Sequence, residues 1–426
     1  MFNKPSHPSS WHPGKKLTRA VLSAVALAAV ALTTPNLAAG QQKRGLSAKT
    51  TVPARFESDK SAVVPFAFEY NEIVLQVRVN NSQPMKFLFD TGAAISVLNV
   101  SKARGLNLKK AGSLDAKAVG GSVQGYLAKG AALSLAGVTV YNQPMAILPL
   151  DFPCEAADIA GILGYDFINS FVVEIDYDTK TLTLSDPSRY EYSGSGDLIP
   201  LTISGNTPRI RAQLSVPNGP TLEGLFELDT GSDGILRINS PFVKKHGLLQ
   251  SLAKQLASAH RGVGGEVKTV DVRMGEFQLG RYVIPELLVA LVQGSDGSPS
   301  ENANDGPLGN EILRRFRIVL DYSRRRMMLE PNQHLGDPIE TDMSGIDFGS
   351  EDCQPYKVTK VFEDSPAADA GIKAGDEIVA LDGRPFKEIP SFEMEKLLST
   401  AGAEYSLGLS RQGKALVVKI KLRRLL

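Results

Sequence analysis

The chain has 426 residues, 42% of them hydrophobic and 22% charged, and its 47 basic and 46 acidic residues leave a net charge of +1. The apolar content excludes a disordered chain, and the length suits two or three domains. A net charge near zero gives no overall field that would attract nucleic acid or an anionic membrane. We therefore expect neither of these as a partner.

Cysteine and histidine usage argues against a disulfide framework and against a metal centre. The two cysteines, Cys154 and Cys353, fall in different predicted domains, which argues against a bond between them. The five histidines are scattered and show no HExxH-type spacing. We therefore expect no metal and no cofactor.

The N-terminus has the pattern of a secretion signal. Three basic residues precede an apolar run over residues 20–32, and small residues follow at 38–40. The run is shorter than the roughly 20 residues that a membrane-spanning helix needs. We predict a signal over residues 1–40, a flexible lead-in over 41–61, and a periplasmic or secreted protein with no membrane span after the signal is removed. An uncleaved membrane anchor is the alternative.

A repeat organises the middle of the chain. The triplet Asp-Thr-Gly occurs at 90–92 and again at 229–231, each time between apolar residues. Two landmarks follow each triplet in the same order, first a Val-Gly-Gly and then an apolar segment that ends in Leu-Gly. The repeat predicts two copies of one structural unit, over residues 62–190 and 197–332, with a polar linker over 192–197 between them.

Both copies are predicted to be rich in β-structure. Apolar and polar residues alternate over 71–80, and short apolar runs bounded by Gly or Pro follow over 268–279 and 282–292. Short helices are predicted over residues 101–105, 166–170, 241–258 and 311–315. The predicted fold class is mostly β, with two tandem β lobes and a small α+β domain after them.

Two Asp-Thr-Gly loops related by a pseudo-twofold axis would bring the carboxyl groups of Asp90 and Asp229 face to face. Like charges about 3 Å apart cannot both ionise, so such a pair shares one proton and titrates as a unit. The charged member can act as a general base on a water, and the protonated member can donate to a peptide carbonyl. The pattern predicts amide hydrolysis that works best below neutral pH. A single copy would be an ordinary turn, but the second copy favours the pair.

The repeated triplet and its later apolar-Leu-Gly resemble the aspartic protease superfamily, in its retroviral-type and pepsin-type branches. The resemblance covers residues 62–332 and implies a bilobal all-β fold with Asp90 and Asp229 as the catalytic dyad. The residues that it implies as support for the dyad are Thr91, Gly92, Thr230, Gly231 and Ser232. The two threonine hydroxyls would interlock the loops.

The same resemblance implies two hairpin flaps that bind substrate. Their tips would be Gly120 and Gly121 in the first copy, and Gly264 and Gly265 in the second. Simple hairpin turns are the alternative. Two flaps and the small size of each lobe favour the retroviral-type pattern.

The two triplets differ in the residue that follows them. Ala93 follows the first and Ser232 follows the second. A serine hydroxyl bonded to a carboxylate favours its ionised form. We therefore expect Asp229 to hold the charge more often than Asp90.

A third module occupies the C-terminal part of the chain. From Ser365 to Ile378 the sequence follows the pattern Ser-Pro-Ala-x-x-Ala-Gly-apolar-x-x-Gly-Asp-x-apolar. This run resembles a PDZ domain of the bacterial protease-associated kind, and the resemblance covers residues 338–426. It implies a loop that captures the C-terminus of a peptide, formed by Gly345, Ile346, Asp347 and Phe348. Asp347 replaces the usual second glycine, so a packing or regulatory domain is the alternative.

Together these features predict a single-chain aspartic endopeptidase that cleaves extended polypeptides, with a PDZ domain for substrate or partner peptides. A non-enzymatic peptide-binding protein on the same fold is the alternative. A monomer is expected, although pairing of each lobe with a second chain stays open. Serine catalysis finds little support because Gly-x-Ser-x-Gly is absent. The natural substrate, the cleavage specificity and the removal of a propeptide are left open by the sequence.

Overall fold

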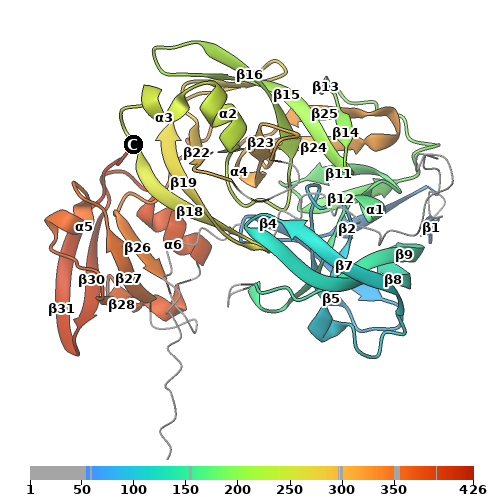
Figure 1. The fold of residues 1–426 in the computed structure, drawn as a ribbon, viewed down its shortest axis with the longest axis horizontal. Coiled ribbons are helices and arrows are strands. Elements are labelled where there is room, and N and C mark those ends of the chain that lie inside the picture. The colour runs from blue at the N-terminus through green and yellow to red at the C-terminus, as the bar shows by residue number, and fades with distance from the viewer. Residues whose placement is uncertain are drawn as a thin grey trace, which may run out of the picture.

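The computed structural model describes residues 54–57, 60–152, 156–295, 297, 301–349, 356–389 and 391–426. The protein is mostly β, as predicted (Figure 1). The predicted signal, the first part of the lead-in and both cysteines lie outside the described residues. In the part of the chain that is described, no helix is long and apolar enough to cross a membrane.

The first lobe is built on a nine-stranded sheet with the order β1-β9-β6-β10-β5-β4-β8-β7, and β3 pairs with β4. The strands are β1 (Ala54–Phe56), β3 (Ala67–Glu69), β4 (Glu72–Val79), β5 (Met85–Phe89), β6 (Val97–Asn99), β7 (Lys109–Ala118), β8 (Gly121–Leu135), β9 (Val138–Leu148) and β10 (Ile159–Leu163). The first triplet follows β5 directly, so its aspartate stands at the end of a buried central strand.

Part of the predicted lead-in is ordered rather than flexible. Strand β1 pairs antiparallel with β9. The ring of Phe56 packs edge-on against Phe171, with 5.9 Å between the ring centroids. One aromatic side chain in a polar stretch is a weak sequence signal, but its burial against the first lobe fixes the strand.

The second lobe contains two sheets. One has the order β21-β20-β15-β16-β23 with β14 on β15, and the other has the order β17-β22-β19-β18. The strands are β14 (Thr202–Ser204), β15 (Thr207–Ser215), β16 (Thr221–Leu228), β17 (Arg237–Ile238), β18 (Leu256–Gly262), β19 (Gly265–Arg273), β20 (Phe277–Leu279), β21 (Tyr282–Ile284), β22 (Leu288–Val292) and β23 (Gly306–Leu308). The second triplet follows β16, as the first follows β5.

A six-stranded sheet joins the two lobes, with the order β13-β25-β24-β11-β12-β2. Its strands are β2 (Ser61–Pro65), β11 (Val172–Asp176), β12 (Thr181–Ser185), β13 (Asp197–Pro200), β24 (Phe316–Asp321) and β25 (Arg326–Pro331). Strand β11 of the first copy pairs antiparallel with β24 of the second. The two copies therefore complete one another within a single chain.

The apolar-Leu-Gly landmark supplies a parallel neighbour for each triplet-bearing strand. Strand β10 pairs with β5, and β23 pairs with β16. The backbone N–H of Asp90 donates to Leu163 O at 3.0 Å, and that of Asp229 donates to Leu308 O at 3.1 Å. The landmark thus fixes the backbone of both aspartates.

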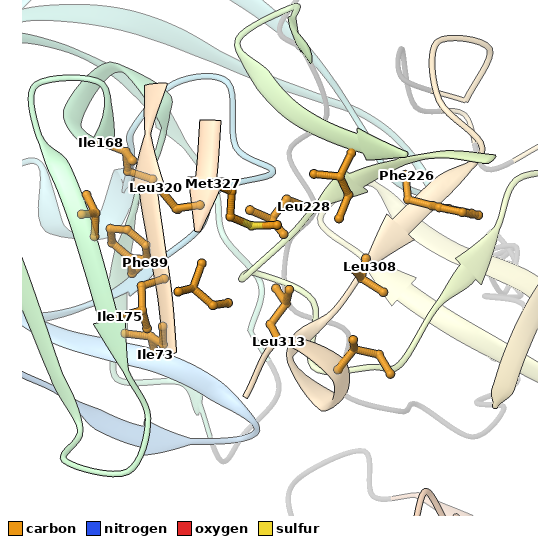
Figure 2. Packing of buried hydrophobic residues seen from close by; sticks show 14 of the residues in the cluster. Ile73, Phe89, Ile168, Ile175, Phe226, Leu228, Leu308, Leu313, Leu320 and Met327 are labelled. Carbon is orange, nitrogen blue, oxygen red and sulfur yellow. The ribbon is translucent and has the colours of Figure 1, made fainter. Parts of the chain in front are cut away.

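One hydrophobic cluster runs through both lobes. It contains the apolar residues that flank the aspartates, including Phe89 and Leu228, together with residues of the shared sheet. Figure 2 shows residues from both lobes in this cluster. The ends of the two triplet-bearing strands are therefore held in a hydrophobic core that both lobes share.

The predicted helices are present except for one overextension. They are η1 (Val100–Lys102), α1 (Tyr165–Ile168), α2 (Ser240–Lys245), α3 (Leu248–Ser251) and α4 (Asn310–Leu313), and the turn η3 (Tyr322–Arg324) was not predicted. The helix predicted over 241–258 is wrong beyond its first turns. Gly247 adopts φ +59 and ends α2, and β18 already begins at Leu256.

The C-terminal module has a core of its own. Its elements are β26 (Ile346–Gly349), β27 (Tyr356–Val361), α5 (Pro366–Asp369), β28 (Glu377–Leu381), β29 (Arg384–Pro385), η4 (Phe386–Glu388), α6 (Ser391–Leu398), β30 (Glu404–Arg411) and β31 (Lys414–Lys421). The Ser365 hydroxyl caps α5 by accepting from Ala368 N. This module, red in Figure 1, lies beside the yellow hairpin β18–β19.

Candidate active site

Asp90 and Asp229 meet at the interface between the lobes, and both are fully buried. Within each loop the carboxylate is held by its own backbone. Asp90 Oδ1 accepts from the N–H groups of Gly92 (2.8 Å) and Ala93 (3.0 Å), and Asp229 Oδ1 accepts from Gly231 N at 3.0 Å. The Oδ2 atoms have no donor among the described residues. Each carboxyl group shifts the pKa of the other, and because like charges at such close range cannot both ionise, the pair shares one proton.

The two threonines interlock the loops. Thr91 Oγ1 donates to Leu228 O at 2.6 Å, and Thr230 Oγ1 donates to Phe89 O at 2.7 Å. Each hydroxyl also accepts from the backbone N–H of the other threonine, at 3.1 and 3.0 Å. Four buried hydrogen bonds therefore fix the relative position of the two aspartates.

The glycines of the triplets allow the carboxyl groups to approach. A methyl group added at Gly92 would lie 2.6 Å from Asp229 Oδ1. A methyl group added at Gly231 would overlap the carboxyl group of Asp90. Each carboxyl group thus packs on the glycine of the opposite loop, and no side chain fits at either position.

The electrostatics of the pair are unequal. Burial raises the pKa of Asp90 well above its usual value, and the charge of Asp229 raises it further. Burial also raises the pKa of Asp229, to about 6, against the hydrogen bond from Asp90 and the charge of Arg237, which lower it. Asp229 is therefore the member that ionises first.

Ser232 is not the cause of this difference, contrary to the sequence-based expectation. Its hydroxyl does not contribute to the pKa of Asp229. The Ser232 carbonyl accepts from Asn310 N at 2.8 Å, and its Oγ lies against Gly309, where an added methyl group would be 2.9 Å away. Ser232 thus links its loop to the start of α4. The charge that lowers the pKa of Asp229 comes from Arg237.

The predicted flap glycines lie at the tips of two hairpins, and the tips touch. Gly120 and Gly121 end the hairpin β7–β8, and Gly264 and Gly265 end the hairpin β18–β19. Gly264 N donates to Val119 O at 2.9 Å. Added methyl groups at Gly120 and Gly264 would overlap the backbone of the opposite tip. This contact closes the two hairpins against each other.

Two asparagines that the sequence analysis missed repeat the twofold arrangement. Asn71 and Asn206 each occupy a tight turn with positive φ. Asn71 Nδ2 donates to the backbone oxygen of Asp233, and Asn206 Nδ2 donates to Ala94 O at 3.3 Å. Each acceptor lies four residues after its aspartate. The signal in the sequence was an Asn in a turn upstream of each triplet.

The sequence analysis also missed the buried charged residues around the pair. Glu72 in lobe 1 and Glu227 in lobe 2 are both nearly inaccessible to solvent, and so are Arg209 and Arg237 of lobe 2. Burial raises the pKa of Glu227 to about 8, and the nearby charge of Asp229 adds to this effect. Glu227 Oε2 accepts from Asn304 Nδ2 at 2.6 Å. In the sequence these residues look like the solvent-facing positions of alternating strands, so nothing marked them as buried.

The predicted peptide-capture loop surrounds the start of an edge strand. Gly345 adopts φ +74, and β26 begins at the next residue. Strand β26 lies at the edge of its sheet, with β27 as its neighbour. Ile346 N donates to Ser344 Oγ at 3.1 Å, and Asp347 is buried. An edge strand is the element that a peptide extends by strand addition.

Family comparisons match both parts of the chain. Residues 75–167 match the family model described as "Aspartyl protease", and residues 343–422 match the one described as "PDZ domain". The resemblances drawn from the sequence are thereby confirmed. The first match includes Asp90 and ends before Asp229.

Curated relatives share shorter segments. The chain is similar to "Periplasmic serine endoprotease DegP" of Salmonella typhimurium, at 34% identity over 93 residues, which is 20% of this chain and 20% of that protein. It is similar to "Periplasmic pH-dependent serine endoprotease DegQ" of Escherichia coli, at 37% over 65 residues, 15% and 14% of the two chains. A "Probable periplasmic serine endoprotease DegP-like" of Pseudomonas putida is 26% identical over 276 residues, 59% and 52%. The chain spans about a fifth of the length of the first of these relatives.

Proposed function

We propose that this protein is an aspartic-type endopeptidase with Asp90 and Asp229 as its catalytic dyad. The observation that carries the proposal is the interlocked pair of loops, in which two buried carboxyl groups each pack on the glycine of the opposite loop. Two carboxyl groups with unequal pKa values are the arrangement that general acid–base hydrolysis requires. The match of residues 75–167 to an aspartyl protease model supports it.

The reaction follows from the unequal pair. Ionised Asp229 takes a proton from a water, and the oxygen of that water attacks the peptide carbonyl carbon. Asp90 carries the proton that stabilises the developing oxyanion. Collapse of the tetrahedral intermediate breaks the C–N bond, and the leaving nitrogen receives a proton from the pair. The dyad then holds one proton again.

Substrate access requires the hairpins β7–β8 and β18–β19 to separate. Both aspartates are fully buried and the hairpin tips are in contact, so a polypeptide reaches the dyad only after the tips part. The hairpins then act as flaps, with Gly120, Gly121, Gly264 and Gly265 as the residues that close over an extended substrate. Apolar side chains around the first flap favour apolar residues beside the cut.

The C-terminal module is proposed to bind peptides through the free edge of β26. The C-terminal segment of a substrate or partner would pair with β26 and add a strand to the sheet. The protein is proposed to act in the periplasm or outside the cell, because the relatives bear periplasmic names and the N-terminus has a secretion pattern. A monomer suffices, since both triplets come from one chain.

The test is cleavage of a peptide library by the wild-type chain, by Asp90→Asn and by Asp229→Asn. Each variant keeps the shape of the side chain but removes the shared proton or the base, so we expect a loss of about 1,000-fold or more in each. A statine-type peptide should block the wild type, and a fluorophosphonate should not. Activity retained in either variant would refute the dyad.

Two other functions would give different results in the same test. A serine peptidase, as the relatives are named, would react with the fluorophosphonate. No hydrogen bond joins His246 or His334 to a serine among the described residues, since His246 packs on the Phe242 ring and His334 lies between Asp178 and Asp337. A non-enzymatic peptide-binding protein is favoured by the complete burial of the dyad. It would bind peptides and leave all of them uncut.

A further inference from the structure

Glu72 is buried, and one oxygen of its carboxyl group lacks a hydrogen-bond partner. Its side chain is 2% exposed, and its Oε1 has no hydrogen-bond partner among the described residues. Leaving a buried polar group unsatisfied costs roughly 1–3 kcal/mol, and more if the group is charged. A carboxyl group at such a position needs another interaction to offset this cost.

The register of the first lobe places Glu72 opposite Asp90. Strands β4 and β5 are antiparallel, with Val74 opposite Leu88. Extending the register by two residues brings Glu72 beside Asp90, on the same face of the sheet. That face carries the hydrophobic cluster of the first flap, which contains both Val74 and Leu88. Glu72 therefore faces the dyad and the flap, away from the main core.

The second lobe has a satisfied residue at the equivalent position. Arg209 lies opposite Glu227 there, and the same extension brings Thr207 beside Asp229. The Thr207 hydroxyl is hydrogen-bonded to Ser204 O at 3.1 Å and to Glu227 Oε2 at 3.3 Å. Only the position beside Asp90 combines burial with an unsatisfied acid.

The groups that surround Glu72 are acidic. Burial raises the pKa of Glu72 well above its usual value, and the charges of Asp233, Asp90 and Asp229 raise it further. These acids are not spaced to hold a metal, because no group of three or more His, Cys, Asp or Glu in the described chain has that arrangement. A single cationic side chain would relieve the repulsion and supply the missing donor.

We propose that Glu72 is a specificity-determining residue that receives the cationic head of a substrate Lys or Arg next to the scissile bond. The inference rests on the proposed endopeptidase function and narrows its substrate class to polypeptides with a basic residue at one position near the cut, among the apolar residues that the flap favours. The aliphatic stem of that residue lies along the apolar side chains of the first flap, and its charged head reaches the carboxylate.

Binding of the basic side chain releases one proton. In the free protein burial raises the pKa of Glu72, the charges of the neighbouring acids raise it further, and both effects favour the protonated form. When the ammonium or guanidinium group arrives, Glu72 ionises, the proton passes to solvent, and a charge-assisted hydrogen bond forms. Preference for a basic residue therefore depends on pH, which a merely structural role of Glu72 would not produce.

The experiment compares matched peptides that carry Lys, norleucine or Gln, scanned over the three positions on either side of the cut. We expect wild type to favour Lys at one position by about 10- to 100-fold in kcat/KM, the range of a charge-assisted hydrogen bond. Glu72→Gln should reduce that preference to less than about 3-fold, and Glu72→Asp should keep part of it.

The control variant is Glu69→Gln. Glu69 pairs with Glu72 across the same hairpin, but its carboxylate is bonded to Lys86 at 2.9 Å. This variant removes a charge from the same turn and should leave the preference for Lys unchanged. Circular dichroism and the melting temperature of each variant show that it folds.

Binding of uncleavable, reduced-bond versions of the peptides tests the inference apart from catalysis. The wild-type chain should bind the Lys peptide more tightly than the norleucine peptide, by a ratio that grows as the pH rises. If both peptides bind equally, or if Glu72→Gln keeps the preference, or if Gln is favoured as strongly as Lys at every pH, the inference is wrong. If the Lys preference is found in binding but nothing is cut, the inference stands and the endopeptidase assignment fails.

Discussion

The two lobes share their backbone arrangement and differ in the charges around it. Both carry an aspartate at the end of a buried strand, an Asn-containing turn that reaches the opposite loop, and a glycine-tipped hairpin. Glu72, Val74 and Leu88 lie beside Asp90. The register of β15 and β16 places Thr207, Arg209 and Glu227 at the equivalent positions near Asp229. At these buried positions lobe 2 has both an acid and a base, and lobe 1 has an acid alone.

This comparison shows what a fused repeat permits. In a dimer of identical chains every substitution appears twice, and the two halves of a shared site stay equivalent. Here each half has its own sequence, so one aspartate lies near Arg237 and the other near an unsatisfied glutamate. The repeated residues fix the relative position of the two aspartates, and the residues that differ between the lobes set the pKa of each aspartate.

The threonine interlock tests the shared part and should give the largest loss of stability. Thr91→Ala and Thr230→Ala each remove two buried hydrogen bonds between the lobes, so we expect a loss of about 2–5 kcal/mol in the free energy of unfolding, similar for both. Thr→Ser at either position keeps the hydroxyl and should lose much less. Chemical denaturation measures this, and a large difference between the two Ala variants would contradict the twofold arrangement.

The pH dependence of cleavage tests the unequal part. Below about pH 6 both carboxyl groups are protonated and the pair lacks a base, so the rate should fall about tenfold per pH unit below that point. Arg237→Gln removes the charge that lowers the pKa of Asp229, so it should move this limb to higher pH. Ser232→Ala should leave it unmoved. A shift of one unit in Ser232→Ala would restore the role that the sequence suggested for this serine.

Stability against pH separates Glu72 from its counterpart Thr207. The folded-state pKa of Glu72 lies above its unfolded value. The carboxyl group therefore contributes stability that is fully present below about pH 4.5 and is lost as the pH rises through the folded-state pKa. Glu72→Gln should thus gain roughly 1–3 kcal/mol over wild type at pH 8 and less at pH 5. Thr207→Val should lose stability at both pH values, and thermal unfolding measures both variants.

The two hairpins also differ in their contacts at the end away from the tips, and the expected effect on stability is smaller. Arg273, at the end of β19, pairs with Glu340 at 3.3 Å and donates to the terminal Leu426 O at 3.4 Å. Arg273→Ala removes a partly exposed pair, so we expect less than about 1 kcal/mol in global stability. Hydrogen exchange should rise at the base of β18–β19 and stay constant in β7–β8. An equal rise in both hairpins would show that the PDZ contact does not act on one flap alone.

The repeat made much of the fold predictable from the sequence. Two copies of the triplet and of the Leu-Gly landmark predicted the two lobes and the meeting of Asp90 with Asp229, whereas the parallel pairing of the landmark strands with β5 and β16 was seen only in the structure. The flap tips followed from the Gly pairs, because a tight hairpin needs positive φ there. The C-terminal module followed from its Ser-Pro cap and glycine stops.

The remaining features depend on contacts between segments that are distant in the sequence. Residues 252–258 read as helix, but pairing of β18 with β19 overrides that local preference. Glu72 and Glu227 look like solvent-facing residues of alternating strands, and only the packing of the two lobes buries them. Ser232 seemed well placed beside its carboxylate, yet its loop turns the hydroxyl toward Gly309.

The antiparallel pairing of β11 with β24 carries one more consequence. The halves of a two-chain enzyme dissociate on dilution. Its catalytic activity then falls with the square of the protein concentration. In this chain the two halves share one continuous ladder, so they face each other at a fixed effective concentration set by the covalent link. Dilution of the protein therefore leaves the two aspartates together.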